Sequence, residues 1–317
     1  MLDFSKIAFI FPGQGSQAVG MGKAITDAYP IAKETIEQAN DIMGINLSEM
    51  MFEGSEDTLG DTAITQPAMY VVGMAVYRAL IQELPDAIPA FVAGHSLGEF
   101  TALTVAGALS YEDGLKLVQK RGELMKLAGE QHPGGMAAIL ALDVEAVQGI
   151  VTQASEQSGG VVVIANDNCP GQIVISGDSN ALGVAVELAK EAGARRAIPL
   201  DVSVATHSPL MQPAKDGLLE ALNLAGINDA TIPVVQNVCA CPVTDATTIR
   251  TNLEKQLVSS VRWTESMQLM IDSGIETFIE LGSKNVLTGL LRRIDRSKTG
   301  ITIQDTTSLS DFITSNT

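Results

Sequence analysis

Gly94-His95-Ser96-Leu97-Gly98 decides the fold, because a G-x-S-x-G sequence between an apolar strand and a helix is the pattern of a nucleophile elbow. The apolar run 88–93 predicts the strand, and the run 99–109, rich in small residues, predicts the helix. The two glycines permit a sharp turn, which would leave Ser96 strained and exposed beside helix N–H groups that can stabilise an oxyanion. In a chain with 29 glycines this motif can arise by chance, but its flanking elements favour a serine nucleophile for acyl transfer.

The composition describes a globular protein. With 317 residues the chain is long enough for one large α/β domain, with or without a smaller insert. Hydrophobic residues make up 46% and charged residues 18%, which excludes a disordered or fibrous chain. The net charge of −17 argues against general binding to nucleic acid, because an anionic surface repels phosphate. An anionic partner must therefore meet a local basic patch.

The cysteines and the apolar runs give expectations about the compartment. Cys169, Cys239 and Cys241 are too few for a disulfide framework and lack the spacing of a zinc site, so we expect reduced thiols, no metal and a cytoplasmic setting. The apolar run 7–11 is too short for the core of a signal peptide. Because no apolar stretch reaches about 18 residues, we expect no membrane span.

The order of predicted elements divides the chain into two parts. The region from Gly135 to about Asp201 predicts β-α-β-β-α-β, the ferredoxin-like arrangement. We therefore expect a small subdomain over 129–201, inserted into a large α/β catalytic domain formed by 1–128 and 202–317. The predicted strands are 7–11, 136–142, 161–165, 172–176, 195–200, 232–238 and 277–281. The predicted helices span 62–84, 111–127, 144–156 and 180–192, and two more start near 19 and 253. Pro67 is expected to break the helix 62–84. The tail after 303 is expected to be poorly ordered.

Three histidines are available as the base that a serine nucleophile needs. His95 is next to Ser96 and should project to another side, and His132 lies in a loop with Gly and Pro, where we expect it to be solvated. His207 follows a predicted strand and fits the Ser-before-His order of elbow enzymes. A lone His before Ser-Pro is, however, more often a capping or surface residue.

The group that orients the base is left open by the residues alone. Asp201 and Asp245 are available, but neither has a context that singles it out. A backbone carbonyl could orient the histidine instead.

Arg121 lies on a helix with an otherwise amphipathic pattern, where a charged residue is normally solvated. If its side chain faces the site instead, the planar guanidinium would hold a carboxylate through two hydrogen bonds. That contact would select a dicarboxylic acyl group.

Six segments follow one another over nearly the whole chain. They are Phe11-Pro12-Gly13-Gln14-Gly15-Ser16-Gln17, Gly94 to Glu99, Arg121-Gly122, 166–177, the region of His207, and 256–263. In this order and spacing the set resembles the malonyl-CoA:acyl carrier protein transacylases, an acyltransferase family of fatty acid and polyketide synthesis. The resemblance implies an α/β fold in which a hydrolase-like parallel-sheet domain carries an inserted ferredoxin-like βαββαβ subdomain, with the active site between the two.

The resemblance also implies a ping-pong acyl transfer. Ser96 would attack the thioester of malonyl-CoA with His207 as general base, and the phosphopantetheine thiol of acyl carrier protein would then take the malonyl group. The backbone N–H groups of Gln14 and Leu97 would form the oxyanion hole. No cofactor is implied, because malonyl-CoA is a substrate.

Further roles follow from the same resemblance. Arg121 would clamp the free malonyl carboxylate, and the carbonyl of Gln256 would orient the histidine. Binding of CoA or of the carrier is expected in the matching segment at Asn166, Asn168 and Gln172.

A local cation cluster is expected because CoA and the carrier are both anionic while this chain is strongly acidic. Lys190, Arg195 and Arg196 flank the last predicted strand of the insert, which leads toward His207. We therefore expect Arg195 and Arg196 to contribute to CoA or carrier binding, although an ordinary solvated helix end is an equal alternative.

Other functions share parts of this pattern. A discrete acyltransferase of a polyketide or malonate decarboxylase system would use the same chemistry, and a serine hydrolase would use the same elbow. An inert carrier-binding module would not need Ser96 and His207 together. The sequence departs from the family at Ala205, where a proline is common and which borders the acyl pocket, and at Gly282-Ser283-Lys284-Asn285, where many members have Gly-Pro-Gly-Lys.

Overall fold

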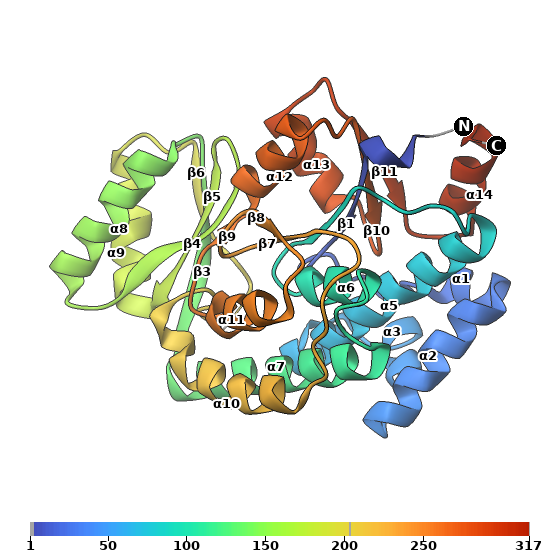
Figure 1. Cartoon of the computed structure of the whole chain (residues 1–317). Coiled ribbons are helices and arrows are strands. Elements are labelled where there is room, and N and C mark those ends of the chain that lie inside the picture. The colour runs from blue at the N-terminus through green and yellow to red at the C-terminus, as the bar shows by residue number, and fades with distance from the viewer. Residues whose placement is uncertain (1–2, 203, 317) are drawn as a thin grey trace.

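Strand β1 (Ile7–Phe11) is buried along its whole length at the centre of a six-stranded sheet (Figure 1). The computed structural model describes residues 3–202 and 204–316. The strand order of this sheet is β11-β10-β1-β2-β7-β8, and its pairs are parallel except β7 with β8. Its other strands are β2 (Phe91–Gly94), β7 (Val234–Gln236), β8 (Cys241–Val243), β10 (Thr277–Leu281) and β11 (Thr299–Ile303).

Helices cover both faces of this sheet. Ile7, Phe9 and Phe11 pack into one hydrophobic cluster, whereas Ala8 and Ile10 pack into another, because successive side chains of a strand point to opposite faces. A strand buried on both faces is a continuous apolar run, which is why its bounds could be predicted without error. The helices are α1 (Lys23–Ala28), α2 (Pro30–Met43), α3 (Leu47–Phe52), α4 (Glu56–Gly60), α5 (Thr62–Glu83), α6 (Gly98–Val105), α7 (Tyr111–Gln131), α10 (Gln212–Leu224), α11 (Ala246–Gln256), α12 (Trp263–Asp272), α13 (Val286–Ile294) and α14 (Thr306–Asn316), with 3₁₀ turns at Phe4–Lys6 and Pro209–Met211.

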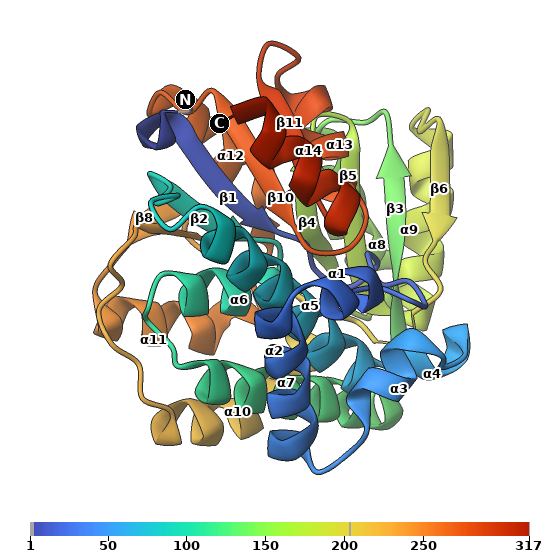
Figure 2. The same ribbon diagram turned by 90° about the vertical axis from the view of Figure 1, so that its right-hand side faces the viewer.

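A second sheet has the order β6-β3-β5-β4-β9 (Figure 2). Its elements are β3 (Gly134–Leu140), α8 (Val144–Ser158), β4 (Val162–Cys169), β5 (Gln172–Asp178), α9 (Ser179–Glu191) and β6 (Arg196–Pro199), followed much later by β9 (Val261–Arg262). The first four strands are antiparallel, and α8 and α9 share one core cluster with them, which is the predicted ferredoxin-like arrangement. β9 pairs in parallel with β4 and comes from outside the range 129–201, whose exact ends stay a prediction.

Two predictions about helix integrity are wrong. Pro67 lies inside a continuous α5, because one missing N–H is outweighed by the burial of most of this long helix. The tail was expected to be poorly ordered, but residues 306–316 are helical. They form α14, in which Leu309 and Phe312 are buried against the main core.

Several element ends also differ from the prediction. The first helix starts at Lys23 and not near 19, since residues 19–22 form turns with Gly20 and Gly22 at positive φ. α6 ends at Val105 because Gly107 has a φ of 76°, and α11 starts at Ala246, where the side chain of Asp245 caps the helix. Within the described ranges we find no helix long and apolar enough to span a membrane.

Cys239, in the turn after β7, and Cys241, the first residue of β8, form a disulfide, so the prediction of reduced thiols is wrong for this pair. Ala240 between them has a φ of 49°, and the two Cα atoms are 5.1 Å apart, within the range that a disulfide spans. Cys169 is free and buried. The two cysteines are only two residues apart in the sequence. Their disulfide therefore constrains one turn and does not connect distant parts of the fold.

Candidate active site

Ser96 lies on the predicted sharp turn between β2 and α6 with a φ of 52°, which is uncommon for a residue with a Cβ. The glycines around it are required by close backbone contacts. A Cβ on Gly94 would lie 1.9 Å from the carbonyl carbon of Gly98, and a Cβ on Gly98 would lie 2.1 Å from the oxygen of Phe11. The motif is therefore a steric requirement of this turn, which presents a half-buried serine hydroxyl.

His207 contacts the serine. Its Nε2 lies 2.8 Å from Ser96 Oγ, and its Nδ1 lies 2.9 Å from the carbonyl oxygen of Gln256 and 3.0 Å from that of Ser259. Carbonyl oxygens only accept hydrogen bonds, so Nδ1 carries the proton and Nε2 is free to accept the serine hydroxyl proton. Burial, helped by the nearby Arg121 charge, lowers the pKa of His207 to about 3. The imidazole is thus neutral at physiological pH, as a general base must be.

The side chains of the other residues considered as the base or as its orienting group lie away from the Ser96–His207 contact. Asp201 and Asp245 are both exposed, and Asp245 caps α11, so neither contacts His207. His132 is exposed at the end of α7, and His95 bonds elsewhere.

Two features around the base differ from the prediction. The residues before it that the structure describes, 200–202 and 204–206, form no strand, and Ser203 lies outside the described residues. His207 is in a turn with a φ of 60°. The contact from Ser259 was not predicted, since any residue type has a carbonyl and the sequence carries no signal for it.

Arg121 is fully buried, so its interpretation as a solvated charge is wrong. Its guanidinium donates to Gln66 Oε1 at 2.7 Å, to Ser96 Oγ at 2.9 Å and to Gln256 Oε1 at 3.2 Å. The Nε atom has no hydrogen-bond partner in the described part of the chain, and burial lowers the pKa of this group to about 10. Nor does Arg121 form an ion pair with any carboxylate of residues 3–202 or 204–316. The buried carboxyl of Glu99 is close enough to favour the charged guanidinium but does not bond it. A buried cation beside the nucleophile with no carboxylate bonded to it is suited to an anionic ligand.

The two backbone groups assigned to the oxyanion hole lie on adjoining segments. Leu97 is the N-cap of α6, where N–H groups lack helical partners, and Gln14 lies in the turn after β1. The loop of Gln14 packs closely on the elbow, because a Cβ on Gly13 would lie 2.4 Å from the oxygen of His95. Gln66, which the sequence analysis did not single out, links the Gln14 side chain at 3.5 Å to the buried guanidinium.

Of the residues expected to bind CoA or the carrier, only Asn168 contacts the elbow directly. Its Oδ1 lies 2.8 Å from His95 Nε2, and both Asn168 and Asn166 are nearly buried on β4. Gln172 begins β5 and accepts a hydrogen bond from Arg293.

Arg195 and Arg196 are exposed at the edge of the second sheet, where they share a pocket of about 550 Å³ with Arg293. Arg293 also donates to the carbonyls of Pro170 and Gly171 at 3.1 Å. Lys190 does not line this pocket and pairs with Glu187 at 2.7 Å. Arg293 was missed because it lies on α13, far along the chain from the other two arginines.

Comparisons with known proteins extend over almost the whole chain. The family model described as acyl transferase domain matches residues 8–309. The malonyl CoA-acyl carrier protein transacylase of Bacillus subtilis strain 168 is 45% identical over 95% of this chain and 94% of its own length. The protein of that name from Haemophilus influenzae is 44% identical over 96% of this chain and 97% of its own length.

Solved structures agree with this similarity. An acyl carrier protein S-malonyltransferase from Vibrio cholerae superposes with a TM-score of 0.93 at 42% identity, covering 97% of this chain and 100% of that chain. A malonyl-transacylase in complex with a type II PKS acyl-carrier protein superposes with a TM-score of 0.94 at 38% identity, covering 98% of this chain and 100% of that chain.

Proposed function

The chain belongs to the acyl transferase domain family, and from this premise we propose that its Ser96 carries a malonyl group from malonyl-CoA to an acyl carrier protein. The enzyme is an acyltransferase, and its partners are malonyl-CoA and the carrier. One observation supports the mechanism above all others. The hydroxyl oxygen of Ser96 lies 2.8 Å from the neutral base His207 and 2.9 Å from the buried cation Arg121.

The first half-reaction forms an ester on the serine. Nε2 of His207 takes the hydroxyl proton as Oγ of Ser96 attacks the thioester carbonyl of malonyl-CoA. The N–H groups of Leu97 and Gln14 would donate to the oxyanion of the tetrahedral intermediate. When the C–S bond breaks, the imidazolium returns its proton to the CoA sulfur. The products are free CoA and malonyl-Ser96.

The second half-reaction reverses these steps with a different thiol. The phosphopantetheine thiol of the carrier gives its proton to His207, and the sulfur attacks the ester carbonyl. The C–O bond breaks and the serine oxygen takes the proton back, which restores the enzyme. No electrons are exchanged, so we propose no cofactor.

Arg121 is the residue that would distinguish malonyl from acetyl. Its guanidinium is buried, its Nε is unpartnered, and its two terminal nitrogens bond only neutral oxygens among the described residues. A buried cation of this kind is stabilised by an anion that arrives with the ligand. The free carboxylate of malonyl, whose carbon is separated by one methylene from the carbonyl carbon that Ser96 attacks, is such an anion.

Mass spectrometry of the intact protein tests this function. We expect a covalent adduct with malonyl-CoA, little with acetyl-CoA, and none in Ser96→Ala, which should fold normally. Adding a holo acyl carrier protein should discharge the adduct to malonyl-carrier. An adduct in Ser96→Ala would refute the mechanism, and rapid release of free malonate in the absence of carrier would indicate a hydrolase instead.

The pathway and the compartment are separate proposals, more specific than the reaction itself. We propose fatty acid synthesis, supported by the likeness to transacylases of bacterial genomes, with a polyketide or malonate decarboxylase system as the alternative. For the compartment we propose the cytoplasm. The Cys239–Cys241 disulfide is compatible with this proposal if it is redox-sensitive, since cytosolic disulfides are usually transient or sensory.

A further inference from the structure

One side chain from the turn after β7 bridges the nucleophile elbow. Asn237 is only 1% exposed. Its Oδ1 accepts the backbone N–H of Ser96 at 2.7 Å, and its Nδ2 donates to the carbonyl of Gly94 at 2.7 Å. A single amide therefore holds the end of β2 and the nucleophile together.

This bridge acts on a backbone that needs support. Ser96 is in the left-handed region, which a residue with a Cβ adopts rarely and only when its surroundings hold it there. Its N–H precedes the first turn of α6 and has no acceptor within that helix, so it needs one elsewhere. Asn237 supplies this acceptor and a donor on the same planar group, which a carboxylate cannot do.

The turn that carries Asn237 is tied to the helix that follows the elbow. The backbone N–H of Asn237 donates to Oε2 of Glu99 at 2.7 Å, and the Gln236 side chain donates to Oε1 of the same carboxylate at 3.2 Å. Glu99 is fully buried on α6. Turn and elbow helix are thus held at a fixed separation.

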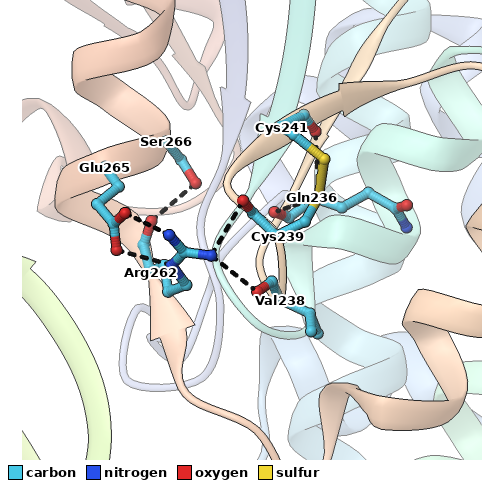
Figure 3. Close-up of polar contacts among 7 residues, drawn as sticks. All are labelled: Gln236, Val238, Cys239, Cys241, Arg262, Glu265 and Ser266. Carbon is cyan, nitrogen blue, oxygen red and sulfur yellow. Dashed lines mark hydrogen bonds and ion pairs between the residues drawn. A yellow bond between two sulfur atoms is a disulfide. The ribbon is translucent and has the colours of Figure 1, made fainter.

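The outer side of this turn is braced as well (Figure 3). The backbone N–H of Arg262 donates to the carbonyl of Asn237 at 3.1 Å, and its guanidinium donates to the carbonyls of Val238 at 3.4 Å and Cys239 at 3.1 Å. The disulfide between Cys239 and Cys241 links the residues on either side of Ala240. The amide of Asn237 is therefore presented by a segment with little freedom.

We propose that Asn237 is a positioning residue for acyl transfer, which acts through the backbone of Ser96 and touches neither substrate nor leaving group. By linking Gly94 to Ser96, it keeps the serine hydroxyl in contact with His207 and the following N–H group, that of Leu97, directed at the oxyanion. This inference rests on the proposed function.

The test compares Asn237→Ala and Asn237→Asp with wild type in single-turnover acylation by malonyl-CoA. The alanine variant loses both bonds to the elbow, and we expect the limiting rate constant to fall about 100-fold, as for a reacting group displaced by about 1 Å. The malonyl-CoA concentration at half-saturation should stay unchanged. The aspartate variant keeps an oxygen for the Ser96 N–H but sets its second oxygen against the carbonyl of Gly94 in place of the donor, so its rate should also fall below that of wild type. If the alanine variant does not fold, the aspartate variant alone tests the proposal.

Asn252→Ala is the matched control. This half-buried amide bonds the same turn, at Gln236 Oε1 and Cys239 Sγ, without contacting the elbow, so its variant should acylate at the wild-type rate. A fluorophosphonate probe, which needs no malonyl recognition, should label Ser96 slowly in Asn237→Ala and normally in the control.

The possible failures are distinguishable. If wild type reacts with the fluorophosphonate but not with malonyl-CoA, the proposed function is wrong. If wild type is acylated and both Asn237 variants react within about threefold of it, the positioning role is wrong. The positioning role is also wrong if the Asn237 variants change the malonyl-CoA concentration at half-saturation and not the limiting rate constant. It is wrong as well if Asn252→Ala lowers that rate constant as much as Asn237→Ala does.

Discussion

At the residue scale, the role proposed for His207 depends on its protonation state, because only the neutral ring can accept the serine proton. The two carbonyl oxygens on Nδ1 set the tautomer, and burial keeps the ring uncharged. We expect His207→Ala to lose several orders of magnitude in acylation rate while retaining the wild-type melting temperature within a few degrees. His95→Ala should lose far less, and the opposite ranking in folded proteins would contradict the assignment of the base.

The pH dependence follows from the same environment. The pKa of His207 is lowered to about 3, so the neutral form dominates well below the ordinary value of 6.5, and the acylation rate should not halve near pH 6.5. Burial raises the pKa of Glu99 to about 7, so the profile is repeated with Glu99→Gln, which removes that titration. A fall centred near pH 6.5 that persists in Glu99→Gln would show that His207 titrates normally.

Selectivity for the acyl group depends on Arg121. We expect Arg121→Ala to lose about 2–4 kcal/mol of transition-state stabilisation with malonyl-CoA, because charge-assisted contacts to the carboxylate disappear, whereas acetyl-CoA has no such contact to lose. The ratio of kcat/KM for the two thioesters measures this difference. Equal losses for both would mean that Arg121 acts only by supporting Gln66, Gln256 and the Ser96 hydroxyl.

The chemically distinctive residues of the site could be predicted from the sequence, but their supports could not. Ser96 is recognised because its turn requires glycines at fixed spacing. Arg121 is recognised because the segment around it resembles the family's segment that contains the arginine expected to bind the carboxylate. Ser259 acts through a carbonyl that every residue has. Asn237 and Gln66 are ordinary amides that reach the site only through tertiary contacts.

At the element scale, the presence of a helix or strand can be predicted from local sequence more easily than the residues at which it begins and ends. The bounds of β1 and β10 agree with the predicted ones: β1 is a continuous apolar run, and β10 is a short, mainly apolar run that contains the buried Glu280. The ends of α1 and α6 depend on single glycines at positive φ, and α14 depends on Leu309 and Phe312 finding the core, which no local pattern reveals.

The braced turn between β7 and β8 is where an element-scale prediction can be made. Reducing the Cys239–Cys241 disulfide gives the turn that carries Asn237 more freedom, while the Arg262 contacts remain. We expect a three- to tenfold slower acylation, about 1 kcal/mol, and an unchanged preference for malonyl over acetyl. Single-turnover rates with and without a phosphine reductant measure it.

The control for this prediction is Cys239→Ser/Cys241→Ser, which should be slow in both conditions. Full-rate acylation by wild type in which mass spectrometry shows both thiols reduced would mean that Arg262 alone holds the turn.

At the scale of the whole molecule, charge is the main constraint. A net charge of −17 opposes the approach of the phosphates of CoA and of an acidic carrier. The three guanidinium groups of Arg195, Arg196 and Arg293 gather around one surface pocket although they come from distant parts of the chain. The ferredoxin-like sheet and α13 thereby create a local positive area that composition alone does not indicate.

We therefore expect Arg195→Glu/Arg196→Glu to raise KM for malonyl-CoA and for the carrier while sparing kcat, and wild-type kcat/KM to fall with added salt as screening weakens these charges. Lys33→Glu/Lys116→Glu is the matched control, because it makes the same change in net charge at two exposed lysines that do not line the pocket. They belong to α2 and α7, which lie away from β6 and α13 (Figure 1). The exposed ion pairs lost in the control contribute little. Because both double variants carry the same net charge, a KM effect confined to the arginine variant would assign docking to the local cluster. Equal KM values in the two variants, with wild-type rates insensitive to salt, would place docking elsewhere on the surface.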